Sequence, residues 1–151
     1  MGTTTPLTVL RGRLRIIGPP VTTITHDGTN NNQAFGLQQW EIHSNAKKGA
    51  SVNFQTTNAF RNTFGGVTIK RDAKIQLDID RQEVAANWVV TSAVSQTNYA
   101  VGNEVAVVSA ISAAPGDATF NVRVTFIETD FSALRAGTYS TTVVGTITAN
   151  K

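Results

Sequence analysis

Apolar and polar residues alternate along most of the chain, a pattern typical of β-strands that have one buried and one exposed face. Residues 74–80, KIQLDID, show it clearly. Helical periodicity is nearly absent, and only residues 80–87 are predicted to form a helical turn, with Glu83 near its start. Strands are predicted at residues 13–17, 21–25, 39–44, 51–55, 67–70, 74–80, 87–94, 104–111, 118–128 and 138–148.

Clusters of Gly, Pro, Asn and Asp separate these runs, as expected for turns between short strands. Residues 59–66 are predicted to form a loop or crossover. Many short alternating strands punctuated in this way predict an all-β, antiparallel β-sandwich. The predicted core comprises the apolar residues of the alternation: Trp40, Ile42, Val52, Phe54, Ile75, Leu77, Ile79, Phe120, Val122, Val124 and Phe126. The residues between them are predicted to face solvent: Lys74, Gln76, Asp78, Asn121, Arg123 and Thr125.

The N-terminal segment is predicted to form a strand with one apolar and one basic face, closed by Gly18, Pro19 and Pro20. Proline cannot donate to a β-ladder, so these residues predict a rigid break after the strand. One interpretation is a leading strand detached from the body, and the alternative is the domain's own first strand, turning at a sandwich corner. One face carries Thr8, Leu10, Gly12, Leu14 and Ile16, and the other carries Val9, Arg11, Arg13, Arg15 and Ile17.

Composition narrows the possible partners. The 151 residues suggest one domain, and 40% are hydrophobic while only 15% are charged. Three arginines and no acidic residue lie in residues 1–17, so this segment accounts for the whole net charge of +3. That segment has no aromatic residue to stack on bases, so no nucleic-acid partner is expected. No apolar run reaches the roughly 18 residues of a membrane span, so no membrane insertion is expected.

Candidate chemistry is sparse. The two histidines, His26 and His43, are isolated and are predicted to be solvent-facing polar residues rather than metal ligands. Asp78 and Asp80 share one strand face, which is predicted to be solvated. The chain has no cysteine, nucleophile elbow or phosphate-binding glycine loop, so neither an enzyme nor a cofactor or metal site is expected. Trp40 and Trp88 lie within strand patterns and are predicted to belong to the core.

The two ends and one hairpin carry a family resemblance. An AGTYS turn, which includes Gly137 and Tyr139, is followed by a final strand with Val143, Gly145 and Ile147. This end resembles that of fimbrial subunits assembled by the chaperone–usher route and is similar to spore-coat-U-like domains. The order of N-terminal extension, prolines, VTTIT and HDG is also similar to these pilins, as is the pattern of residues 40–54.

The resemblance implies an immunoglobulin-like sandwich that lacks one strand, with a body at residues 18–151 and a donor strand at residues 1–17. In such a subunit the donor fills the groove of a neighbour, which builds a homopolymer head to tail. The implied groove-facing residues are Thr8, Leu10, Gly12, Leu14 and Ile16, and the implied solvent-facing residues are Arg11, Arg13 and Arg15.

This assembly implies an extracellular filament on the cell surface, a removed signal peptide, and a periplasmic chaperone and outer-membrane usher as partners. Two alternatives stay open. A monomeric adhesin or carbohydrate-binding sandwich predicts an exposed aromatic patch around Trp88 or Tyr99. A viral coat, tail or decoration protein predicts closed rings or shells.

Overall fold

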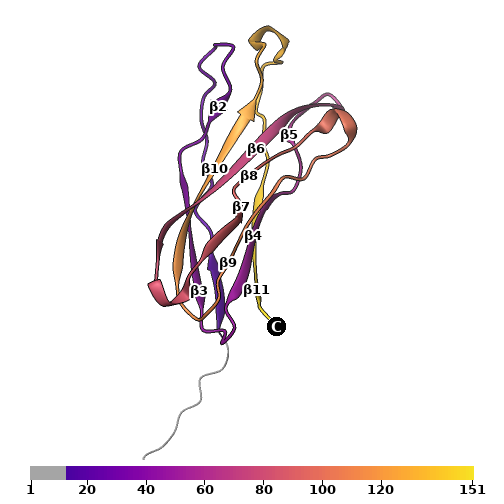
Figure 1. Cartoon of the computed structure of the whole chain (residues 1–151). Helices are drawn as coiled ribbons and strands as arrows, with labels where there is room; N and C mark the ends of the chain where they lie inside the picture. Colours follow the sequence, from indigo (N-terminus) through magenta and orange to yellow (C-terminus); the bar gives the residue numbers. More distant parts are fainter. Residues whose placement is uncertain (1–12) are drawn as a thin grey trace, which may run out of the picture.

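The computed structural model describes residues 13–151. They form two antiparallel β-sheets that pack face to face into an elongated sandwich (Figure 1). The predicted fold class, an all-β antiparallel sandwich of immunoglobulin-like type, is confirmed. The first 12 residues of the predicted extension, with Thr8, Leu10, Arg11 and Gly12, lie outside the described residues.

The larger sheet has seven strands and the smaller has four. The path through the seven-stranded sheet is β1 (Leu14–Ile17), β3 (Gln38–Ser44), β10 (Ala118–Ile127), β6 (Val67–Gln82) and β5 (Phe60–Phe64), with β2 (Gln33–Ala34) on β10 and β8 (Val94–Gln96) on β6. The four-stranded sheet has the order β11 (Val143–Ala149), β4 (Ala50–Thr56), β9 (Val107–Ile111) and β7 (Val89–Ser92). Short 3-10 turns occur at η1 (Val84–Ala86), η2 (Tyr99–Val101) and η3 (Phe131–Ala133).

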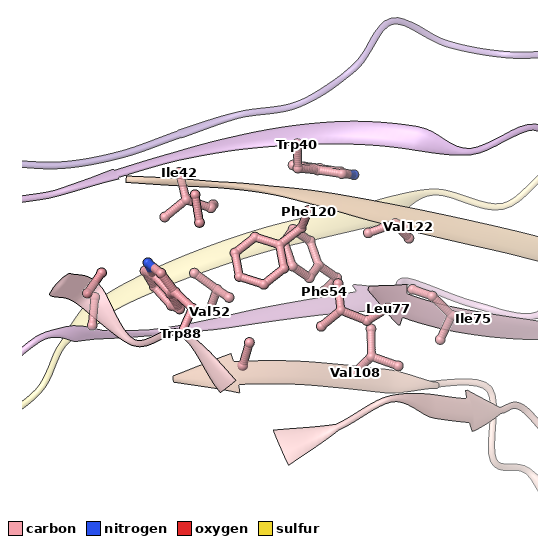
Figure 2. Packing of buried hydrophobic residues seen from close by; sticks show 14 of the residues in the cluster. Trp40, Ile42, Val52, Phe54, Ile75, Leu77, Trp88, Val108, Phe120 and Val122 are labelled. Atoms are coloured by element: carbon pink, nitrogen blue, oxygen red, sulfur yellow. The ribbon is translucent and has the colours of Figure 1, made fainter. Parts of the chain in front are cut away.

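The core lies between the inner faces of the two sheets (Figure 2). Four aromatic rings form its centre: Trp40 meets Phe54 at 5.2 Å between ring centroids, and Trp88 meets Phe120 at 5.4 Å. Phe54 and Phe120, one from each sheet, lie 5.9 Å apart and join the two pairs. The predicted core is therefore correct: every residue assigned to it is buried except Ile79, which is partly buried and packs against it.

Two predicted elements are wrong. Residues 59–66 are not a loop, because β5 pairs with the start of β6 through a hairpin turn at Gly65 and Gly66, both at positive φ. Residues 21–25 are not a strand: no neighbouring strand pairs with them, and Val21 is 96% exposed.

Other boundaries shift. The two strands predicted at 67–70 and 74–80 are one continuous strand, β6. The run at 87–94 divides between β7 in one sheet and β8 in the other. The last strand begins at Val143, five residues later than predicted. The helical turn predicted at 80–87 is confirmed as η1, with Glu83 at its N-cap.

Candidate functional site: an open seam between two edge strands

Strands β1 and β11 are edge strands of different sheets and lie along the same side of the sandwich. Among the described residues, β1 is paired only with β3, and β11 only with β4. The two edges contact each other through side chains, and no β-ladder joins them. We call this side of the sandwich, bounded by β1, residues 18–22 and β11, the seam. The outer edge of β11 therefore presents unpaired backbone groups along a strand of seven residues.

β1 closes the half of the seam that lies next to residues 44–50. Leu14 and Ile16 pair with Ser44 and Ile42 of the same chain. Ile16 packs against the core, whereas Leu14 is 36% exposed. Arg13 and Arg15 are exposed. Residues 14–17 thus pair in cis within the monomer, as in the alternative interpretation of the N-terminal strand. Their exchange between subunits stays a prediction.

A wedge of three residues spans the seam. The ring of Trp40 lies between Gly18, which follows β1, and Gly145 on β11. A Cβ at Gly18 would lie 2.9 Å from Trp40 Cζ3, and a Cβ at Gly145 would lie 2.7 Å from the same atom. Both distances are too short for a side chain, so the two glycines allow the edges to close on the indole. Within this packing, Trp40 Nε1 is buried and has no hydrogen-bond partner.

The other half of the seam, beyond the end of β1 at Ile17, is hollow. A cavity of ≈ 290 Å³ opens between residues 19–22 on one side and residues 141–143 on the other. Its floor is mostly apolar and reaches Trp40 of the core described above and a second, smaller buried cluster of Phe60, Ala73, Val124 and Phe126. The lining residues are Pro19, Pro20, Val21, Thr22, Phe35, Gln38, Trp40, Phe60, Val124, Thr141, Thr142 and Val143.

A second recess, of ≈ 500 Å³, lies beside the first, between residues 17–22 and residues 36–41. It follows from the length of β1, which ends with Ile17 opposite Glu41. The preceding residues of β3, Gln38 to Trp40, pair with β10 and have no ladder partner on the β1 side. The seam therefore offers unpaired backbone on β3 as well as on β11.

The residues of the C-terminal resemblance lie on or near the seam. Val143, Gly145 and Ile147 form the inward face of β11. The Tyr139 hydroxyl donates to the Arg135 carbonyl and accepts from the Arg135 N–H, each at 3.2 Å, and its ring contacts Phe126. Gly137 has φ +136°, beside the Asn62 amide. Gly137 and Tyr139 therefore shape the loop that leads into β11.

The two histidines lie in different parts of the sandwich. His26 was predicted to face solvent, but its side chain is only 20% exposed and packs against Phe126 and Phe131. His43 Nδ1 lies 2.9 Å from Asp117 Oδ2 on the outer face of the larger sheet. Within residues 13–151, no three His, Cys, Asp or Glu side chains come together as metal ligands would.

One ionic cluster joins three side chains from different parts of the chain. Lys70 and Arg61, from β6 and β5, both pair with Glu104, whose side chain is 17% exposed. Hydrogen bonds from Lys70 and then from Arg61 lower the pKa of Glu104. The cluster ties the β5–β6 hairpin to the loop before β9. A hydrogen bond from the Thr29 hydroxyl lowers the pKa of Asp27 in the exposed turn at 26–33 in the same way.

The exposed aromatic patch that a sugar-binding protein would need is not centred on Trp88. This residue is 2% exposed, and its Nε1 donates to the Gly116 carbonyl at 3.3 Å. Tyr99 is half-buried in η2. Within the described part of the chain, no helix is long and apolar enough to cross a membrane.

Comparison with known proteins found no match among protein-family models, curated proteins or solved structures. The function of the seam is therefore inferred from its geometry alone. Gly145 lies in the predicted C-terminal motif and Gly18 in the predicted break after the N-terminal strand, but their contact with Trp40 was not predicted, because a close approach between sheets leaves no local pattern. The local signal for this contact in the sequence was a glycine next to the proline pair that ends the N-terminal strand.

Proposed function

We propose that the protein is a structural subunit that polymerises head to tail into a surface filament by strand addition at the seam. The unpaired outer edge of β11, next to an apolar cavity between the two sheets, is the observation that carries the proposal. An added strand would hydrogen-bond to this edge and insert alternate side chains into the cavity. The other face of the added strand would remain in solvent.

The segment that precedes β1 has the pattern such a donor requires. Thr8, Leu10 and Gly12 alternate with Val9 and Arg11 in the sequence. Residues 1–12 extended at about 3.3 Å per residue cover about 40 Å, whereas the seven residues of β11 cover about 23 Å. The segment is therefore long enough to pair with the whole edge and still cross between subunits.

The energetics favour a donor that is apolar on one face. Full burial of a leucine side chain contributes roughly 1.5–3 kcal/mol. Each backbone hydrogen bond to the β11 edge adds about 0.5–1.5 kcal/mol net.

The position of the chain ends favours addition between copies. Arg13 lies at the end of β1 that is held by Asn45, whereas the cavity lies beyond the other end of β1, next to Pro19. Donor and acceptor are different surfaces, so the contact is heterologous, and we propose that the rotation between successive subunits does not close a ring. Contacts of this kind generate filaments.

Two variants of the N-terminal segment test the proposal. Leu10→Asp places a carboxylate on the groove-facing side, and Val9→Asp places the same charge on the opposite side. We expect Leu10→Asp to be monomeric in sedimentation velocity, whereas Val9→Asp and the parent protein form filaments visible by negative-stain electron microscopy. Equal assembly of the two variants, or a parent protein that stays monomeric at every concentration, would refute the proposal.

A further inference from the structure

The turn at residues 26–33 places an aspartate directly before a glycine. Gly28, which follows Asp27, has φ +77°. Because glycine has no side chain to hinder the approach, its backbone nitrogen can attack the carboxyl group of a preceding aspartate and close a succinimide ring. The Asp27 side chain is 52% exposed, so burial does not protect it from this reaction. Its reactivity therefore depends on its neighbours in the turn.

His26 supplies a base at the nitrogen that would react. The Gly28 N–H donates to His26 Nδ1 at 3.0 Å, and a ring nitrogen that accepts a hydrogen bond carries no proton. The same Nδ1 lies 3.8 Å from Asp27 Oδ1. The imidazole is held in place by aromatic neighbours, with its centroid 5.0 Å from that of Phe131 and 6.2 Å from that of Phe126. A positioned base thus touches the nucleophile and lies beside the carboxyl group.

The carboxylate of Asp27 is restrained by three hydrogen bonds. Its Oδ1 accepts from the Thr29 N–H at 2.9 Å, from the Thr29 hydroxyl at 2.6 Å and from Gln33 Nε2 at 2.9 Å. Hydrogen bonds of this kind favour the ionised form, and the Thr29 hydroxyl contributes most to lowering the pKa of Asp27. Ring closure consumes the acid form, from which a hydroxyl can leave as water. The bonds therefore oppose the reaction.

We propose that Asp27–Gly28 is a self-modification site, at which Asp27 rearranges to isoaspartate with His26 as the base and with Thr29 and Gln33 as the restraint. His26 Nδ1 takes the proton of the Gly28 N–H, and the nitrogen bonds to Asp27 Cγ. The carboxyl hydroxyl then leaves with that proton as water. A water molecule reopens the ring, and opening at the main-chain carbonyl of Asp27 leaves the peptide bond running through Cγ. This site is independent of the proposed filament.

The modification would change how the turn holds a neighbouring loop. Asn30 Oδ1 accepts from the Phe131 N–H at 2.8 Å, and Asn32 Oδ1 accepts from the Glu128 N–H at 3.0 Å. An isoaspartate adds the Cβ of residue 27 to the path of the main chain, which lengthens the turn and shifts these two acceptors. The rearrangement would therefore loosen the contact between residues 26–33 and residues 128–131.

The test removes the restraint in the full-length protein. Thr29→Val with Gln33→Leu eliminates the two side-chain hydrogen bonds to Asp27 and keeps the backbone one. Asn31→Ala, in the same turn, is the matched control and leaves the contacts of Asp27 in place. Isoaspartate at residue 27 is measured by peptide mass spectrometry with electron-transfer fragmentation after incubation at neutral pH. We expect it to form at least about tenfold faster in the first variant than in the parent and the control, the factor that one hydrogen bond to a charged group is worth.

A second variant separates base catalysis from a merely loosened turn. His26→Phe, added to Thr29→Val/Gln33→Leu, keeps an aromatic ring against Phe126 and Phe131 but removes the base. We expect isoaspartate to form at least about tenfold more slowly than with His26 present. Equal rates with and without His26 would overturn the proposal, and so would a Thr29→Val/Gln33→Leu protein that reacts no faster than Asn31→Ala.

Discussion

The loss of stability caused by a methyl group at Gly145 should show how tightly the two edges of the seam pack together. The Cβ of Gly145→Ala would lie 2.6 Å from Ile16 Cδ1 and 2.7 Å from Trp40 Cζ3. Optimal carbon–carbon contact is about 3.5–4.0 Å, so each neighbour must retreat by about 1 Å. Ile16 Cδ1 ends a flexible side chain and can rotate. The Trp40 ring has less freedom, because it is buried in the core and its centroid lies 5.2 Å from that of Phe54.

The expected cost follows from two opposing contributions. Overpacking of a closed core costs about 1–3 kcal/mol. Alanine in place of glycine in a strand recovers about 0.5–1 kcal/mol. The free energy of unfolding should therefore fall by about 1 kcal/mol in urea denaturation. Measurement in the Leu10→Asp background keeps assembly from contributing to the stability.

A double-mutant cycle separates the clash from other effects. In a Trp40→Leu protein the obstructing ring is absent, so Gly145→Ala should become neutral or stabilising, with a coupling energy of about 1–3 kcal/mol between the two sites. Gly36→Ala is the matched control, because a Cβ there has no neighbour within 4 Å. Equal losses in both Trp40 backgrounds, or a Gly145→Ala protein as stable as Gly36→Ala, would refute the wedge.

Two further predictions concern the sandwich outside the seam. The lowered pKa of Glu104 means that its pairs with Lys70 and Arg61 stabilise the fold above about pH 4.3, the ordinary Glu pKa, and lose this contribution as the pH falls through the lowered value. Glu104→Gln should therefore be less stable than the parent at neutral pH in thermal denaturation, with the difference shrinking at acid pH; a difference independent of pH would contradict the pairing. Ser112→Ala removes the hydroxyl that accepts from the buried Ala50 N–H at 2.8 Å and should cost about 1–3 kcal/mol in urea denaturation. An unchanged unfolding midpoint would show that another acceptor replaces it.

Much of the sandwich could be predicted because its strands are half-buried. On β10, the inward series Phe120, Val122 and Val124 alternates with Asn121 and Arg123, and this alternation alone identifies the strand and its buried face. At residues 21–25 the same pattern misled, because the alternation is present but no neighbouring strand pairs with the segment. Alternation with a period of two indicates which face of a strand is buried. Which strand it hydrogen-bonds to depends on the arrangement of the whole sheet.

The hairpin at 60–71 was missed for a different reason. Two adjacent glycines flanked by β-formers are a strong signal for a tight turn between strands, but the segment lacks clean alternation. Phe64, at the tip of the hairpin, is apolar but 74% exposed, and Arg135 lies 5.0 Å from the centroid of its ring. The turn chemistry was therefore the better guide than the hydrophobic pattern.

The seam could be predicted only in part. The resemblance of the C-terminal strand pointed to β11, and the Gly18, Pro19 and Pro20 break pointed to the end of β1. That these two edges face each other across a cavity depends on the crossing between sheets, which no short segment encodes. The predicted donor face also extended to Leu14 and Ile16, which pair in cis with β3 in the monomer.

Hydrogen exchange at the β11 edge tests the central claim most directly. Amide exchange would be compared between the assembled parent protein and the monomeric Leu10→Asp variant, with β7, the other edge of the same sheet, as internal control. We predict that assembly slows exchange within Val143–Ala149, because an added strand pairs with the free edge of β11, and leaves β7 unchanged. Equal exchange at β11 in filament and monomer would contradict strand addition at the seam.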